Sequence, residues 1–213
     1  MSSNDDDNLV ELKDWWQRNG KPLVTGGLLA LIAVFGWQAW TKYQANQSQG
    51  ASNLYQQLLE TSLTPSGTPD TAKVAELAGK LKNDFGGSAY AQYGSLFVAK
   101  VAVDSGKLDD AAVELKSVVD KPADATLGEL ARQRLAQVMA AQNKAEEALK
   151  LLDGDADKAF VAAREELKGD LLVQLGRADD AHAAYQKAKA ALSDEAAVGG
   201  LQIKLDDLAK GDA

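Results

Sequence analysis

The sequence predicts an all-α protein: a single N-terminal membrane-spanning helix is followed by a row of paired helices, an α-solenoid that ends in a capping helix. Three observations lead to this prediction. An uncharged apolar stretch long enough to cross a membrane lies near the N-terminus. A hexamer recurs at intervals of about one helix pair. No alternating apolar pattern typical of β-strands competes with the helical spacing.

The bulk composition limits the classes of function. The chain has 213 residues, a formal net charge of −8 and 46% hydrophobic residues, so it is acidic but too apolar for wholesale disorder. An acidic chain argues against a nucleic-acid partner, which needs basic side chains to face its phosphates. There is no cysteine, which excludes disulfides, thiolate metal sites, cysteine nucleophiles and a lipid-modified N-terminal cysteine.

Residues 22–42 are predicted to form the transmembrane helix, after a cytoplasmic tail of residues 1–21. The twenty residues between Lys21 and Lys42, PLVTGGLLALIAVFGWQAWT, are uncharged, and at about 1.5 Å per residue they span roughly 30 Å, the thickness of the hydrocarbon layer. Pro22 suits the first turn of a helix. Tryptophans flank both ends, as aromatic belts do: Trp15, Trp16, Trp37 and Trp40. A cleaved signal peptide is the alternative, but its apolar core is only about 7–15 residues long and ends in small residues.

Basic residues predict the orientation of this helix, because they favour the cytoplasmic side of a membrane. Lys13, Arg18 and Lys21 precede the helix, whereas only Lys42 follows it closely. The N-terminus is therefore expected in the cytoplasm and the chain from about residue 43 onward on the other side.

Small residues share one face of the predicted membrane helix. Gly26, Ala30 and Ala33 follow helical spacing, and small residues in that arrangement let a second helix approach closely. Glycine and alanine are also common in membrane helices in general, which is the simpler interpretation. Packing against another helix is the alternative.

The remaining chain is expected to form helix pairs over residues 53–213, after a linker at 43–52. The segment TPSGTPD at 64–70 contains two prolines and a glycine and predicts a loop. The helices on either side of this loop form a first, irregular pair that ends at the glycines 86–87.

A repeated hexamer marks the turns of three later pairs. It reads GKLDDA at 106–111, NKAEEA at 143–148 and GRADDA at 176–181. Each copy begins with a residue that tolerates the left-handed conformation found at helix ends. Two acids then complement the dipole at the start of the next helix, and the final alanine leaves room where two helices cross.

Two further predictions concern helix ends. Thr126 and Glu129 have the spacing of a capping box, in which each side chain caps the other residue's backbone N–H. An amphipathic stripe after Ser193 predicts a last helix that covers the open end of the row. Its apolar residues are Val198, Leu201, Leu205 and Leu208.

A period near 34 residues with this layout resembles the tetratricopeptide repeat. The third copy matches best, with Gly169, Leu172, Ala181, Tyr185 and Ala188 at the small, apolar and aromatic positions. The other copies retain Ala99, Ala111, Leu115 and Val118, and Ala136, Ala148 and Leu152. The tryptophan-like first position is occupied instead by Ser95, Arg132 or Glu165. The repeats are therefore degenerate.

No residue pattern predicts catalysis, a cofactor or a metal site. The only histidine, His182, has no partner for a triad or a metal cluster and is interpreted as a surface residue. The acids at 153, 155 and 157 imitate the start of a calcium-binding EF-hand loop, but Lys158 and Arg164 occupy the positions that require Gly and Glu. These acids are interpreted as part of a turn between repeats. We therefore expect a protein that is not an enzyme.

The layout as a whole is similar to that of the YfgM family. The acidic tail, the segment NLVELKDWWQRNGKP, the single anchor, ASNLYQQLL and the degenerate repeats together show this resemblance. It implies an ancillary subunit of the SecYEG translocon in the bacterial inner membrane, with the repeat domain in the periplasm. It also implies association with the chaperone PpiD and a role in handing over newly exported client proteins. The alternatives are a scaffold for another envelope assembly, in outer-membrane biogenesis or division, and an envelope enzyme.

Protein binding is expected on the first helix of each pair, because these helices line the concave face of such a solenoid. Five residues on them, outside most of the apolar stripes, are assigned to this surface: Gln92, Tyr93, Arg132, Gln133 and Arg164. The 26 acidic and 19 basic residues after Lys42 give the domain a formal charge of −7. A basic partner and salt-sensitive binding are therefore expected.

Overall fold

Helices make up almost all of the described chain. The computed structural model describes residues 3–62, 70–192 and 195–210. Within these ranges there is no strand, and the all-α fold class is confirmed. The elements are α1 (Ser3–Ser62), α2 (Thr71–Phe85), α3 (Ala89–Asp104), α4 (Leu108–Asp120), α5 (Ala125–Ala141), α6 (Ala145–Leu151), the 3-10 helix η1 (Lys158–Phe160), α7 (Val161–Gln174), α8 (Ala178–Ala191) and α9 (Glu195–Lys210).

The chain divides into two compact units, Met1–Gly50 and Ala51–Ala213. The described residues of the first unit all lie in α1, which continues into the second unit. Among the described residues, α1 is the one helix long and apolar enough to cross a membrane. This helix begins at Ser3 and not at Pro22, and it continues through the proline, which lies inside it. Residues 43–52, predicted as a linker, are also helical, since they contain no proline and only one glycine.

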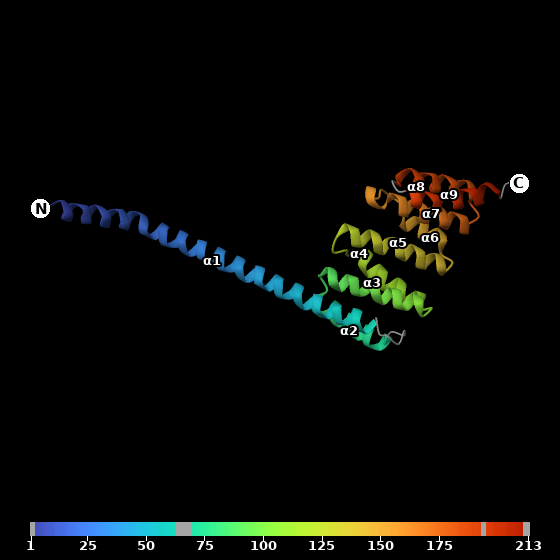
Figure 1. Ribbon diagram of the computed structural model, residues 1–213. Coiled ribbons are helices and arrows are strands. Elements are labelled where there is room, and N and C mark those ends of the chain that lie inside the picture. The colour runs from blue at the N-terminus through green and yellow to red at the C-terminus, as the bar shows by residue number, and fades with distance from the viewer. Residues whose placement is uncertain (1–2, 63–69, 193–194, 211–213) are drawn as a thin grey trace. The chain divides into compact units, whose positions relative to one another are not determined.

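In the second unit the helices follow one another as stacked antiparallel pairs (Figure 1). The hexamers close the turns of α3–α4, α5–α6 and α7–α8. Their first residues, Gly106, Asn143 and Gly176, have φ values of 73°, 63° and 71°, so the left-handed conformation expected there is confirmed. In each copy the N–H of the next residue donates to the carbonyl oxygen five positions earlier, at 2.8–2.9 Å. This hydrogen bond defines a Schellman turn, which explains why each copy begins with glycine or asparagine.

The core of the second unit is a series of overlapping clusters. Each cluster combines residues of a helix pair with residues of the following helix, as in solenoids whose repeats contact only their neighbours. The hexamer alanines Ala111, Ala148 and Ala181 are 0% exposed and belong to three different clusters. Their predicted position between crossing helices is confirmed.

Replacing Ala181 by leucine should destabilise the pair formed by α7 and α8. The alanine is fully buried against Leu172 and Tyr185, and extra methylenes in a packed core cost about 1–3 kcal/mol. Thermal unfolding of the full-length Ala181→Leu variant, followed by circular dichroism at 222 nm, should give a lower melting temperature. An unchanged melting curve would show that α7 and α8 can separate without cost.

The ends of several helices are capped by side chains. The predicted capping box at the start of α5 is wrong, because Asp124 caps this helix and accepts the Leu127 N–H at 2.8 Å. Glu129 makes other contacts, described below. The predicted last helix is confirmed as α9, whose Leu201 and Leu205 are buried in the cluster of α7 and α8. Most of the loop predicted at 64–70 lies outside the described residues, and its last residue, Asp70, caps α2.

Candidate protein-binding surface

Three of the five residues assigned to the binding surface instead converge on one buried carboxylate, that of Glu129 on α5. Arg164 on α7 donates from Nε to Glu129 Oε1 at 2.9 Å, and its Nη2 bonds Oε2. Arg132 donates to Oε2 at 2.9 Å and Gln133 to Oε1 at 3.0 Å. A further bond joins Arg164 Nη1 to the Gly154 carbonyl oxygen at 3.1 Å.

Arg164 therefore ties the second repeat to the third and is not a surface residue. Arg164 is 3% exposed and Glu129 is 6% exposed. Their pairing satisfies both charges at a position where an isolated charge would be very unfavourable. Arg132 and Gln133 remain partly exposed at the edge of this cluster.

The same contacts determine the ionisation of Glu129. Burial raises the pKa of its carboxyl group, but the hydrogen bonds from Arg164 and Gln133 outweigh burial, and the pKa falls to about 2. The carboxylate is therefore charged throughout the physiological range. Charge is required here, because an ionised carboxylate accepts bonds from both arginines.

We expect the contribution of Glu129 to stability to disappear in acid. Because its pKa in the folded chain lies below the ordinary value of 4.5, the contribution is complete above about pH 4.5 and is lost as the pH falls toward 2. The melting temperatures of the native chain and of the Glu129→Gln variant should therefore converge over this interval. A difference that stays constant down to pH 2 would contradict the assigned pKa.

Gln92, the fourth assigned residue, holds the connection between α4 and α5. Its Nε2 donates to the Lys121 carbonyl oxygen at 2.7 Å, and its Oε1 accepts the Ala123 N–H at 2.8 Å. The side chain is only 9% exposed. Backbone groups in such a connection have no helical partner, and a side-chain amide can satisfy a donor and an acceptor at once. Gln92 is therefore a structural residue and not a free surface residue.

Tyr93 stays at the surface and belongs to a tyrosine group formed with Tyr55 and Tyr90. Tyr55 lies near the end of α1 and the other two on α3, and the three ring centroids are 5.8–6.3 Å apart. Tyr93 is 39% exposed and the other two are half-buried. Burial, and to a smaller degree Tyr93, raises the pKa of Tyr55. Partly exposed tyrosines combine apolar area with a hydrogen-bonding group, which is typical of protein interfaces.

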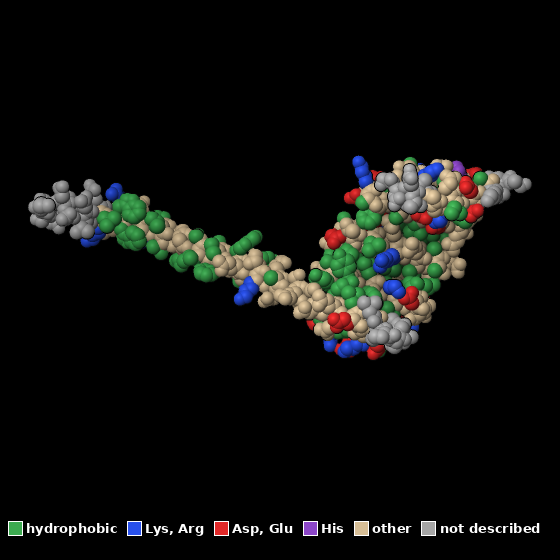
Figure 2. Space-filling model, in the orientation of Figure 1, with side chains coloured by type: hydrophobic (Ala, Val, Ile, Leu, Met, Phe, Trp, Pro, Cys, Tyr) green, Lys and Arg blue, Asp and Glu red, His purple; other side chains and the backbone are tan. Residues whose placement is uncertain are grey.

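A cleft of about 360 Å³ lies between α3 and α5, here called the α3–α5 cleft. Figure 2 shows hydrophobic side chains gathered over these two helices, with Lys and Arg side chains beside them. The buried or half-buried lining residues are Leu96, Ala99, Leu108, Leu115 and Val138. The exposed lining residues are Lys100, Val103, Arg134, Gln137 and Ala141. Sequence reasoning missed this cleft, although most of its lining residues recur at helical spacing on two successive first helices, α3 and α5.

Other residues singled out in the sequence lie on α1 and α8. Gly26, Ala30 and Ala33 are exposed on α1 in the first unit, and their role in helix packing stays a prediction. His182 is exposed on α8. Among the residues whose side chains are placed, no group of three or more His, Cys, Asp or Glu side chains is arranged to hold a metal ion.

Stacked helix pairs with Schellman turns and buried alanines define a helical-repeat protein of the tetratricopeptide type. The chain belongs to the family described as tetratricopeptide repeat-like domain, whose model matches residues 13–210.

Comparison with curated proteins gives relatives of nearly the same length. A protein of Escherichia coli (strain K12) named ancillary SecYEG translocon subunit is 29% identical over 206 residues, which cover 96% of this chain and 97% of the relative. Proteins of the same name from Haemophilus influenzae and Neisseria gonorrhoeae are 27% and 29% identical, over 88% and 94% of this chain and 90% and 95% of their own lengths. The resemblance stated from the sequence is confirmed. These names describe a translocon subunit and not a class of enzyme.

Proposed function

We propose that this chain is a membrane-anchored helical-repeat module that associates with the SecYEG translocon and holds newly exported proteins beside it. The observation that carries the proposal is the similarity to relatives named ancillary SecYEG translocon subunit, because it extends over the candidate membrane helix and the repeats together. A shared anchor and a shared repeat domain favour a shared site of action more strongly than either part would alone.

The proposal places the N-terminus in the cytoplasm and the repeat domain in the periplasm of a bacterial inner membrane. The excess of Lys and Arg before residue 22 supports this orientation. Protease added to the cytoplasmic face of sealed membranes should leave residues 60–213 intact. Digestion of the repeat domain from that face would contradict the orientation.

The surface of the second unit suits a holding role. The tyrosine group and the α3–α5 cleft offer apolar contacts to segments that an incompletely folded protein exposes, and no bond needs to be made or broken. An anchor that confines the domain to the membrane raises its effective concentration beside a translocon. Weak binding of each client is therefore sufficient. A periplasmic chaperone, PpiD, is proposed as the partner that receives the held protein.

Affinity purification of the full-length protein from gently solubilised membranes tests the translocon association. Recovery of SecYEG subunits supports the proposal. Their consistent absence, with an outer-membrane or division complex in their place, would favour a scaffold for that assembly. A photo-crosslinking residue at position 93 should also capture exported proteins, whereas the same residue at the exposed Val113 on α4 should capture far fewer.

A further inference from the structure

The α3–α5 cleft has the size and lining of a side-chain pocket. Its volume of about 360 Å³ lies at the lower end of the roughly 300–1,000 Å³ that is typical of ligand pockets. Leu96 and Leu115 are almost fully buried, and Ala99 in the same lining adds only a methyl group. An apolar side chain of a bound polypeptide fits this lining, whereas a whole helix requires a longer groove.

The charges at the cleft are opposite in sign to the charge of the chain as a whole. The net charge is −8, yet the lining includes Lys100 and Arg134 and no acid. Lys100 pairs with Asp104 at 2.5 Å, but both side chains are more than half exposed, so the pair is weak and easily exchanged. Arg134 is exposed and makes no ion pair within the described ranges. An exposed guanidinium can bind a carboxylate through two parallel hydrogen bonds.

The tyrosine group provides a second contact on the same helix. Tyr93 and Lys100 are seven residues apart, two turns of α3, so they share a face and lie about 10 Å apart along the axis. A polyproline II segment advances about 3.1 Å per residue and has three residues per turn, so side chains three positions apart lie on the same face, about 9 Å from each other. Two such side chains can therefore reach both places.

We infer that the α3–α5 cleft binds an apolar side chain with an adjacent carboxylate, in a polyproline II segment whose second apolar residue, three positions away, contacts Tyr93. This inference rests on the proposed function, because it specifies which segments of exported proteins the repeat domain holds. It differs from the expectation of a basic partner drawn from the net charge, since the local charge at the cleft is positive.

Two fluorescent peptides of twelve residues test the inference. In one, a leucine is followed by glutamate and a phenylalanine lies three positions from the leucine; in the other, lysine replaces the glutamate. Binding to the full-length protein in lipid nanodiscs is measured by fluorescence anisotropy. Because a hydrogen bond to a charged group contributes about 1.5–3 kcal/mol, the acidic peptide should bind about tenfold or more tightly than the basic one.

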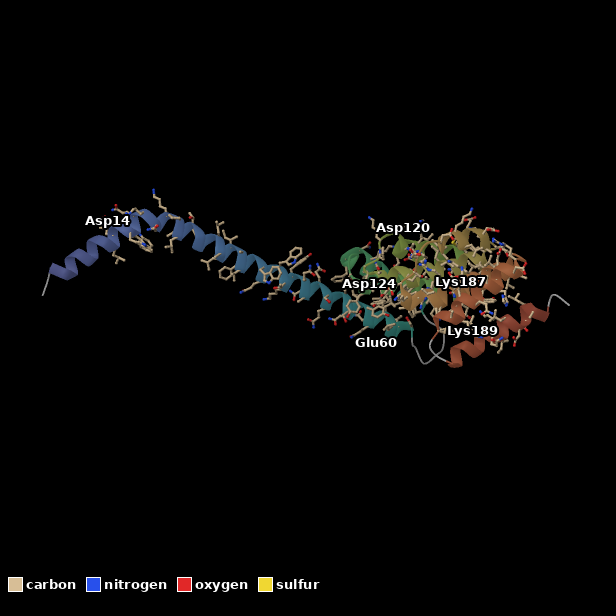
Figure 3. The ribbon with its side chains drawn as sticks, turned by 90° about the horizontal axis from the view of Figure 1, so that it is seen from above. Asp14, Glu60, Asp120, Asp124, Lys187 and Lys189 are labelled. Carbon is tan, nitrogen blue, oxygen red and sulfur yellow. The ribbon has the colours of Figure 1, made fainter. Side chains whose placement is uncertain are left out.

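Matched variants locate the binding site. Arg134→Glu should abolish the preference for the acidic peptide, and Arg134→Gln should reduce it. Lys187→Glu makes the same change of charge on α8 (Figure 3), where the lysine is exposed and does not line the cleft, and should leave the preference intact. Circular dichroism checks that each variant is folded.

The outcomes separate this inference from the proposed function. Equal affinity for the two peptides, binding of neither peptide, or equal losses in Arg134→Glu and Lys187→Glu would each overturn the inference. SecYEG recovered by full-length Arg134→Glu would show that the translocon association stands without the cleft. Selective peptide binding without any recovery of SecYEG would support the cleft and contradict the proposed function.

Discussion

The Arg164→Met variant should melt at a much lower temperature than the native chain, because it leaves the buried Glu129 carboxylate without its main partner. Arg164 supplies two of the hydrogen bonds to this carboxylate and is itself 3% exposed. Breaking a buried ion pair on one side costs about 3–5 kcal/mol. For a domain of this size that loss lowers the melting temperature by roughly 10 °C. Thermal unfolding of the full-length protein in nanodiscs, followed by circular dichroism, measures the shift.

A second substitution separates the loss of stability caused by the unpaired charge from the loss caused by poorer packing. The double variant Glu129→Leu/Arg164→Met removes both charges, and buried ion pairs replaced by apolar side chains often lose little stability. It should therefore melt above the single variant, since Arg132 is partly exposed and can turn to water. Lys116→Met breaks an exposed pair with Asp120 and should cost less than about 1 kcal/mol. If single and double variants are equally unstable, the cost comes from packing alone.

The turns and the crossing alanines could be predicted from the sequence because they depend on local chemistry. A positive φ restricts the residue type at one position, and two acids at a helix start respond to a dipole that lies within the same turn. The same hexamer therefore marks the same turn wherever it occurs. The extent of α1 could not be predicted from the charges at 21 and 42, since charge limits a membrane span but does not end a helix.

The binding surface was harder to predict, because whether a polar side chain is buried or exposed depends on its partners in another repeat. Glu129 and Arg164 are 35 residues apart in the chain. The i, i+3 spacing of Thr126 and Glu129 fits the pattern of a capping box, but Asp124 is the residue that caps this helix. The signal that could have revealed this pair is the occurrence of polar residues about one repeat apart on successive first helices. A polar residue that recurs in this way on an otherwise buried helix face indicates a contact between repeats more strongly than it indicates a binding site.

Gly169→Ala should destabilise the chain although alanine is the better helix former. A Cβ at position 169 would overlap the ring of Tyr185 on the facing helix α8. The ring is fixed, because Tyr185 is 3% exposed, its hydroxyl donates to Asp170 Oδ1 at 2.7 Å, and Lys204 Nζ of α9 lies 5.4 Å from its centroid. Relief of the overlap requires α7 and α8 to separate, and overpacking of this kind costs about 1–3 kcal/mol or more.

The same substitution in α2 provides the control. A Cβ built at Gly79 meets nothing within 4 Å, so Gly79→Ala should be stabilising by about 0.5–1 kcal/mol through helix propensity alone. Chemical denaturation of both full-length variants should therefore give free energies of unfolding that differ from the native value in opposite directions. If both variants are stabilised, the contact between Gly169 and Tyr185 does not limit how closely these helices pack. In that case sterics would not explain why glycine occupies position 169.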